Sequence, residues 1–300
     1  MEFTYSVIIP HYNIPDLLIR CLDSVPVRED IQVIVVDDCT PGGEDLPERY
    51  PQLKRPYLEF FRAPRNGGAG WSRNLALPRA QGTWLVFGDA DDCFAEGAFD
   101  AMDRYAGSDA DIVFFRTGQK VEGDWKPGPH YEWLYNAYKK AVETGNDGHL
   151  RAGHIPPWGK MLRRSFVENL GVLFDETRYS DDVLFSIRTG AAARKVIVAP
   201  ELIYYAYLRQ GSQTNPEIWT LPVIYDWAEK AILANGLYRK HFNCYFGDAY
   251  ESLAVLFRRD FGAFCRLLPL AVRNKVSLRR LFRRAWNSPL KAQGWQNESE

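Results

Sequence analysis

The alternation of strand-like and helix-like segments over residues 1–115 restricts the possible folds of this chain more than any other feature. Five short runs rich in β-branched and aromatic residues are predicted strands: Tyr5–Pro10, Ile31–Asp38, Tyr57–Phe61, Trp84–Asp89 and Asp111–Phe115. Apolar residues at helical spacing predict helices between them: Leu17–Val25, Gly70–Leu77 and Phe94–Tyr105. This order is typical of a largely parallel, doubly wound α/β sheet, whose ligands bind at the carboxyl ends of the strands.

The rest of the chain predicts a second half of this domain and then a helical extension. A passage rich in Gly and Pro, 118–129, interrupts the alternation. Beyond it we predict helices and two strands: Tyr131–Thr144, Ser165–Asn169 and Asp181–Ala193, then strands Val196–Ala199 and Leu202–Tyr207. After Pro216 the pattern is helical to about Trp286. The expected division is a domain over 1–215, with halves 1–116 and 117–215, and a helical C-terminal extension over 216–300.

Composition supports a globular intracellular protein. Apolar residues make up 46% and aromatic residues 14% of the chain, enough for a large core. The five cysteines are scattered, odd in number and without CxxC spacing, which argues against a disulfide framework or a zinc site and favours a reducing compartment. No apolar run approaches the roughly 18 residues that span a bilayer, and no signal-peptide pattern occurs at the N-terminus. We therefore expect a cytoplasmic location.

Three carboxylates follow the predicted buried strand at Trp84–Phe87: Asp89, Asp91 and Asp92. Crowded carboxylates repel one another, so a cation is expected nearby. An Asp-x-Asp arrangement offers the oxygen ligands preferred by Mg²⁺ or Mn²⁺ holding a diphosphate. The alternative is a polar turn in which Asp91 or Asp92 caps the next helix.

Several motifs in order resemble the nucleotide-sugar domain of family 2 glycosyltransferases, which have the Rossmann-like GT-A fold. They are Val7–Asn13, Val35–Asp38, Asn66–Asn74 and Asp89–Asp92, continued by Trp158–Ser165 and Asp181–Phe185. The resemblance covers roughly residues 4–210. A nicotinamide-binding or P-loop enzyme is disfavoured, because no GxGxxG follows the first strand and no GxxxxGK[ST] occurs.

The resemblance implies roles on the donor side. Tyr12 would stack on the base, Asp38 would accept from a pyrimidine N–H, and Arg73 would contact the phosphate or sugar. Asp89 would reach the ribose, and Asp91 or Asp92 would bind the metal. The implied donor-binding set is completed by Pro10, Asn13, Asn66, Gly67, Ala90 and Arg209. Simpler alternatives are core packing for Tyr12 and a surface ion pair for Arg73.

On the acceptor side, the resemblance implies that Asp182 is the general base. The family has a Glu-Asp pair at this point, whereas this chain has Asp181-Asp182, so the role of Asp181 is less defined. The alternative is that Ser180 and Asp181 cap the following helix. Trp158 and Lys160 are placed by the resemblance at the acceptor side, with packing under the sheet as the alternative.

These observations predict a metal-dependent, inverting glycosyltransferase with Mn²⁺ or Mg²⁺ as cofactor. The expected donor is a nucleoside-diphosphate sugar, with UDP favoured, and the expected acceptor is a saccharide or lipid-linked saccharide in surface polysaccharide assembly. Two other functions remain open, a sugar-phosphate nucleotidyltransferase and a non-catalytic nucleotide-sugar-binding protein. The nucleotidyltransferase would need a basic, Gly-rich loop near residue 12, where the chain has His11-Tyr12-Asn13.

The C-terminal segment 258–291 carries ten Lys/Arg and one acidic residue, Asp260, interspersed with Leu, Phe and Trp. Basic and apolar residues at helical spacing favour contact with an anionic membrane surface. Packing on the catalytic domain and an oligomer contact are alternatives. Nucleic-acid binding is not expected, because the remainder of the chain is acidic and contains no nucleic-acid motif.

Overall fold

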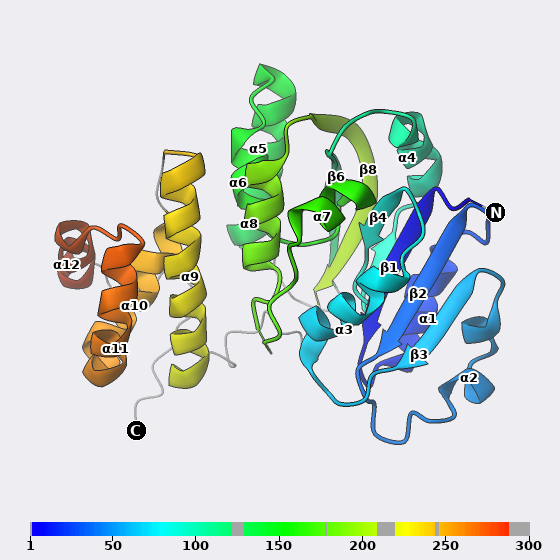
Figure 1. Cartoon of the computed structure of the whole chain (residues 1–300), viewed down its shortest axis with the longest axis horizontal. Helices are drawn as coiled ribbons and strands as arrows, with labels where there is room; N and C mark the ends of the chain where they lie inside the picture. The colour runs from blue at the N-terminus through cyan, green and yellow to red at the C-terminus, as the bar shows by residue number, and fades with distance from the viewer. Residues whose placement is uncertain (1, 122–128, 178, 209–219, 244–245, 288–300) are drawn as a thin grey trace. The chain divides into compact units, whose positions relative to one another are not determined.

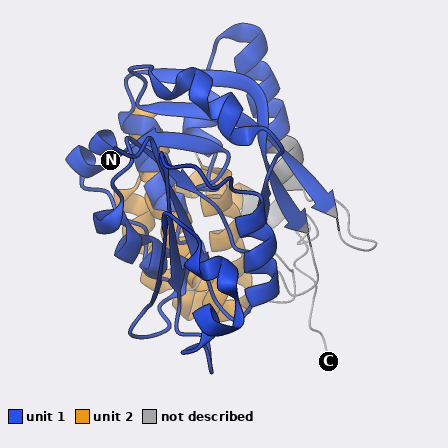
Figure 2. Cartoon of the chain, turned by 90° about the vertical axis from the view of Figure 1, so that its right-hand side faces the viewer, with its two compact units in different colours: residues 1–209 blue, residues 210–300 orange. Residues whose placement is uncertain are grey.

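The computed structural model describes all residues except 1, 122–128, 178, 209–219, 244–245 and 288–300. The chain divides into two compact units, Met1–Arg209 and Gln210–Glu300 (Figure 2). The predicted boundary between residues 215 and 216 lies outside the described residues.

The first unit is built on a mixed sheet whose order within the described residues is β3-β2-β1-β4-β7-β6-β8-β5 (Figure 1). Its strands are β1 (Tyr5–His11), β2 (Ile31–Asp37), β3 (Leu58–Arg62), β4 (Trp84–Phe87), β5 (Cys93–Phe94), β6 (Ile112–Val121), β7 (Lys160–Arg163) and β8 (Val196–Leu208). The α-helices of this unit are α1 (Pro15–Asp23), α2 (Leu46–Arg49), α3 (Gly68–Ala76), α4 (Ala98–Ala106), α5 (Pro129–Thr144), α6 (Gly148–Gly153), α7 (Arg164–Leu170) and α8 (Val183–Ala192).

Strands β1 to β4 form the parallel half that the sequence predicts. Every residue of β1 and β2 is buried, as expected for strands covered on both faces. The register pairs His11 with Asp37 and Ile8 with both Ile34 and Phe87. The carboxyl ends of β1, β2 and β4 therefore lie at one edge, and the polar residues after them are brought together there.

The structure differs from the predicted elements in several places. Residues 93–94 form strand β5, antiparallel to β8, so the prediction of a helix beginning at Phe94 is wrong. The Phe94 ring packs against Tyr204. The helix begins only after Gly97, which has a left-handed backbone conformation with φ of 71°. Strand β7 was not predicted. The two strands predicted around residue 200 form one strand, β8, whose pairing with β6 is irregular near Arg116.

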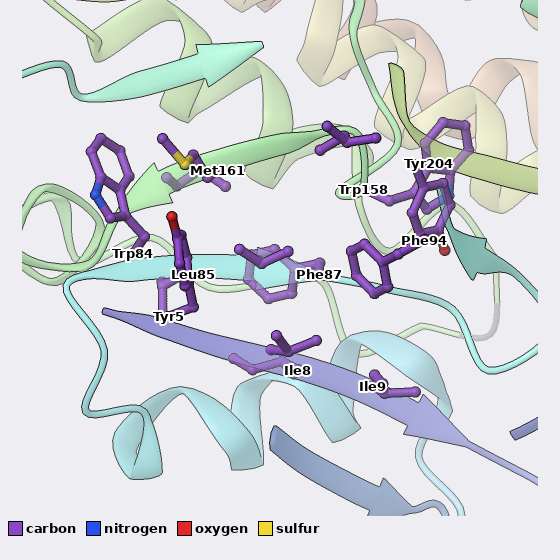
Figure 3. Packing of buried hydrophobic residues seen from close by; sticks show 14 of the residues in the cluster. Tyr5, Ile8, Ile9, Trp84, Leu85, Phe87, Phe94, Trp158, Met161 and Tyr204 are labelled. Atoms are coloured by element: carbon purple, nitrogen blue, oxygen red, sulfur yellow. The ribbon is translucent and has the colours of Figure 1, made fainter. Parts of the chain in front are cut away.

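Aromatic side chains fill the core of this unit (Figure 3). Tyr5, Trp84 and Phe87 are fully buried. The indole N–H of Trp84 donates to the carbonyl of Ala106 at 2.9 Å, so burial leaves no unpaired donor there. The ring of Phe87 packs edge-on against Phe174 and Phe185. These contacts fix β4 against the elements on either side and thus position the residues that follow it.

The second unit contains four helices in its described residues, α9 (Leu221–His241), α10 (Gly247–Arg259), α11 (Phe261–Arg273) and α12 (Leu278–Asn287). They enclose a separate core that includes Ile224, Leu253 and Leu267. The predicted helical C-terminal region is confirmed. Across the described residues, none of the helices has both the length and the apolar character needed to cross a bilayer.

Candidate active site

The acidic turn, Asp89–Asp92, follows β4 and is tied to β8 by Tyr204. The amide N–H of Asp89 donates to the Tyr204 phenol oxygen at 2.8 Å. The phenol O–H donates in turn to Asp92 Oδ2 at 2.9 Å, and the amide N–H of Tyr207 donates to Asp92 Oδ1 at 2.8 Å. Both carboxylate oxygens of Asp92 therefore accept hydrogen bonds from protein groups, and the residue is buried.

Electrostatics in the acidic turn are unfavourable for three negative charges. Burial, and then the carboxylates of Asp89 and Asp91, raise the pKa of Asp92 well above its ordinary value. Asp91 is half-buried, and its backbone carbonyl accepts a hydrogen bond from Arg20 at 2.6 Å. Ala90, between these acids, is buried. Additional positive charge at this turn would lower its electrostatic energy.

Arg73 connects the acidic turn to the start of α8. This side chain, 3% exposed, lies on α3 and donates from Nη2 to Asp89 at 2.6 Å and from Nη1 to Asp181 at 2.5 Å. The alternative of a surface ion pair is therefore wrong for Arg73. A guanidinium has the planar set of donors that such a bridge between two carboxylates requires.

Gly70 allows α3 to approach the segment before α8. A Cβ at this position would lie 2.2 Å from the carbonyl oxygen of Asp175 and 2.8 Å from the Cβ of Asp181. A backbone oxygen does not yield as a flexible side chain does, so only glycine fits without a shift. The glycine thus helps to place Arg73 within reach of Asp181.

Asp182 stands at the N-cap position of α8, but its side chain makes no capping hydrogen bond. Its backbone carbonyl accepts from the amide of Ser186 at 2.9 Å and so begins the helix. Burial, and then the neighbouring Asp181 carboxylate, raise the pKa of Asp182 to about 7, while Arg73 acts in the opposite direction. A carboxyl group with this pKa suits proton transfer near neutral pH.

The predicted base-binding residues follow β1 and β2. Tyr12 is 46% exposed, so its ring is not core filling. Asn13 has φ of 56°, and its amide N–H donates to Thr40 Oγ1 at 2.8 Å, which fixes the turn that presents Tyr12. Pro10, within β1, is buried and pairs with Val36.

Asp38 holds the loop before α3. Its two carboxylate oxygens accept from the amides of Gly67 at 2.9 Å and Gly68 at 2.8 Å, and Oδ1 also accepts from Ser72 at 3.2 Å. The adjacent Asn66 is exposed. A pyrimidine N–H that donates to Asp38 would therefore bind a carboxylate that already accepts hydrogen bonds from the loop before α3.

Trp158 and Lys160 are both buried. The Trp158 ring stacks on Tyr204, with centroids 5.1 Å apart. At least one face of the ring is therefore used for packing, as the alternative interpretation of Trp158 expected. Lys160 Nζ donates to the carbonyl of His154 at 2.8 Å and to Ser186 Oγ at 3.1 Å. Burial lowers the pKa of Lys160 to about 7, against the opposing attraction of Asp182.

Sequence reasoning missed two features of the site. Tyr204 was placed in a predicted strand but given no role, although the alternation of side chains in a strand could have set it apart from Tyr205. His11 is buried, and its Nδ1 lies 3.1 Å from Asp37 Oδ1. The predicted donor contact Arg209 lies outside the described residues.

Comparison with known proteins gives one family match and several relatives. Residues 6–171 match the model of the family described as Glycosyl transferase family 2. The chain is 26% identical over 250 residues to the uncharacterized glycosyltransferase EpsJ of Bacillus subtilis, a match covering 79% of this chain and 70% of EpsJ. It is 25% identical to the poly(ribitol-phosphate) beta-glucosyltransferase of Bacillus spizizenii, over 69% of this chain but only 33% of that protein.

Solved structures share the fold. TarS 1–349 of S. aureus in complex with UDP-GlcNAc has a TM-score of 0.59 at 18% identity, covering 95% of this chain and 92% of that one. The mannosyltransferase PcManGT from Pyrobaculum calidifontis, in complex with GDP-Man and Mn²⁺, has a TM-score of 0.52 at 18% identity, covering 97% of this chain and 78% of that one. The predicted GT-A fold is thereby confirmed.

Proposed function

This chain belongs to glycosyl transferase family 2, and on that premise we propose that it moves a sugar from a nucleoside diphosphate to a hydroxyl group of a glycan, with inversion at the anomeric carbon. The observation that carries the proposal is the bridge made by Arg73. It holds Asp89, on the donor side, and Asp181, beside the proposed base, within 2.6 Å of one guanidinium. An inverting transfer needs donor and base on opposite sides of one reacting carbon.

For the donor, we propose a UDP-sugar. The exposed ring of Tyr12 offers a stacking face for a base at the edge where β1 and β2 end. Asp89 is half-buried and follows β4, which pairs with β1 and ends at the same edge, and its carboxylate would accept from ribose hydroxyls. A structure with UDP-GlcNAc bound exists for TarS, whose fold this chain shares.

For the metal, the residues present fit Mn²⁺ or Mg²⁺. No group of three or more His, Cys, Asp or Glu in the described parts of the chain is arranged to hold an ion alone. Such ions commonly take one or two carboxylates and complete their shell with substrate phosphates and water. Asp92 is buried, with both carboxylate oxygens accepting protein hydrogen bonds, whereas Asp91 is half-buried and more accessible to an ion, so we assign the direct contact to Asp91. When bound, the cation would neutralise charge on the departing diphosphate.

The protein's own residues would complete the reaction. Asp182 accepts the proton of the acceptor hydroxyl, for which its raised pKa is suited. Arg73 keeps the Asp181 carboxylate paired, so that Asp181 does not compete for that proton. Trp158, stacked on Tyr204, and the buried Lys160 support the wall beneath the acceptor side.

For the acceptor, we propose a saccharide or polyol of a surface polymer, free or lipid-linked. The relatives support this class, since one is named as a poly(ribitol-phosphate) beta-glucosyltransferase and another as the succinoglycan biosynthesis protein ExoO of Rhizobium meliloti. The chain spans only part of both, 33% and 61% of their lengths.

An assay that separates three functions tests the proposal. UDP-glucose and UDP-GlcNAc are incubated with Mn²⁺ and ribitol-phosphate or glucan oligomers, and release of UDP is measured. A parallel reaction contains UTP and glucose 1-phosphate, and release of pyrophosphate is measured. Oligomer-dependent UDP release supports transfer. Pyrophosphate release would show a nucleotidyltransferase, and tight UDP binding without either product would show a non-catalytic binding protein.

A further inference from the structure

Three helices of the second unit bring four phenylalanines together on its surface. Phe257, at the end of α10, lies with its ring centroid 5.7 Å from Phe261, 5.2 Å from Phe264 and 5.6 Å from Phe282. Phe264 is buried, whereas Phe261 is 60% and Phe282 46% exposed. We call Phe257, Phe261, Phe264 and Phe282 the aromatic patch. Two of its rings remain largely in contact with water, which is unfavourable for apolar side chains of this size.

Helices α11 and α12 carry further exposed apolar side chains. Val272 of α11 is 54% exposed and Leu278 of α12 is 38% exposed. Leu278 and Phe282 are four residues apart and so lie on one face of α12. Arg279 and Arg283, each one residue further, form a second exposed row beside them. α12 thus presents an apolar edge and a basic edge side by side.

The stretch of sequence that carries Phe261, Phe264 and Phe282 is strongly basic. Residues 258–283 include eight Lys/Arg and a single acidic residue, Asp260. The Asp260 carboxylate accepts a hydrogen bond from the amide of Ala263 at 2.8 Å and caps α11. The one negative charge of this stretch therefore stabilises a helix end.

We propose that the aromatic patch, with the arginines at its edge, docks on an anionic lipid surface. Phe261 and Phe282 would enter the boundary between head groups and acyl chains, while Arg279 and Arg283 contact the head groups. A bilayer supplies a negatively charged layer directly above an apolar one, and α12 carries a basic and an apolar edge that match these two layers. An acidic protein would match the charge but would leave the exposed rings without an apolar partner.

Vesicle binding by the full-length protein tests this proposal without donor or acceptor. The protein is floated with phosphatidylcholine vesicles and with vesicles containing phosphatidylglycerol, at low and at physiological salt. We expect binding only to the anionic vesicles. Binding should weaken as salt is added, because salt shortens the Debye length and so screens the attraction between the arginines and the charged surface. The double variant Arg279→Glu/Arg283→Glu should bind at least about tenfold more weakly, since each basic residue contributes substantially at such a surface.

Two further variants separate the causes. Phe261→Ser/Phe282→Ser keeps the charge and should also lose binding. Lys139→Glu/Lys140→Glu reverses the same number of charges at exposed positions of α5 and should retain it. Absence of wild-type binding at low salt overturns the proposal, as does equal loss in the α5 control. A lipid-free dimer that the serine variant dissociates would instead identify the patch as an interface between copies.

Discussion

The phenol of Tyr204 donates a hydrogen bond to the buried carboxylate of Asp92 at 2.9 Å, although 112 positions separate the two residues. The same phenol oxygen accepts from the amide of Asp89. A single side chain of β8 therefore fixes both ends of the acidic turn. The turn's shape depends on this distant strand as much as on its own sequence.

Tyr204→Phe should reduce stability and metal-dependent donor binding together. The variant keeps the ring stacked on Trp158 but removes the phenol oxygen, which leaves the Asp89 amide unpaired and one oxygen of Asp92 without its donor. We expect a loss of about 1–3 kcal/mol in the free energy of unfolding, measured by urea denaturation. Tyr105→Phe, which removes a half-buried hydrogen bond to Glu201 and none to the acidic turn, is the matched control.

Asp91→Asn should weaken UDP binding in Mn²⁺ and leave binding in EDTA unchanged. The substitution removes the charge that we assign to the metal while leaving the hydrogen bonds of Asp92 intact. Asp92→Asn should act mainly on stability, because that side chain is buried and bonded. Calorimetric titration of UDP into both variants, with each condition, provides the measurement. If Asp91→Asn binds UDP with wild-type affinity in Mn²⁺, the assignment is wrong.

Asp182→Asn should retain donor binding and lose transfer. The amide preserves the shape but does not accept the proton, so turnover should fall on the order of 10²–10⁴-fold. In the wild type, transfer should increase with pH through about 7, because burial holds the pKa of Asp182 there and the base must be deprotonated. Asp100→Asn, an exposed position on α4, is the control. Near-normal turnover of the Asp182 variant would exclude it as the base.

Gly70→Ala should destabilise the site by about 1–3 kcal/mol, the usual cost of forcing extra volume into a packed position. The added Cβ would meet the Asp175 carbonyl at 2.2 Å, so α3 must move and take Arg73 with it. Donor affinity should fall as well. Gly107→Ala provides the comparison, since a Cβ there meets nothing within 4 Å. Thermal melting with and without UDP measures both effects.

Lys160 should make stability depend on pH in a defined direction. Burial lowers the pKa of its folded form from 10.5 to about 7. Between these values the unfolded chain holds a proton that the folded chain lacks, so the free energy of unfolding rises with pH across this window. The free energy of unfolding of the wild type minus that of Lys160→Met should therefore become more positive from pH 7 to pH 10.5. A flat difference would mean that Lys160 keeps its charge inside the fold. Lys139→Met, at an exposed position of α5, controls for the loss of one lysine.

Local patterns were sufficient for much of the fold. β1, β2 and β4 were predicted because fully buried strands appear as continuous apolar runs, and the family match covers the motifs that follow them. β5 was predicted as the start of a helix because a strand of two residues is too short to show the alternation of apolar and polar side chains that identifies strands. Its strand conformation comes from pairing with β8, more than a hundred positions later.

The sequence by itself determined the fold class, the family and the types of side chain at the strand ends, because hydrophobic periodicity and short motifs are local properties of the chain. Only the tertiary structure decided which of those side chains are buried and which partners they bind. Asp91 and Asp92 are equivalent in sequence, yet the hydrogen bonds from β8 bury one and leave the other half-buried. The bridge from Arg73 to Asp181, 108 positions apart, likewise arises because Gly70 lets α3 approach the segment before α8, a contact that no local pattern encodes.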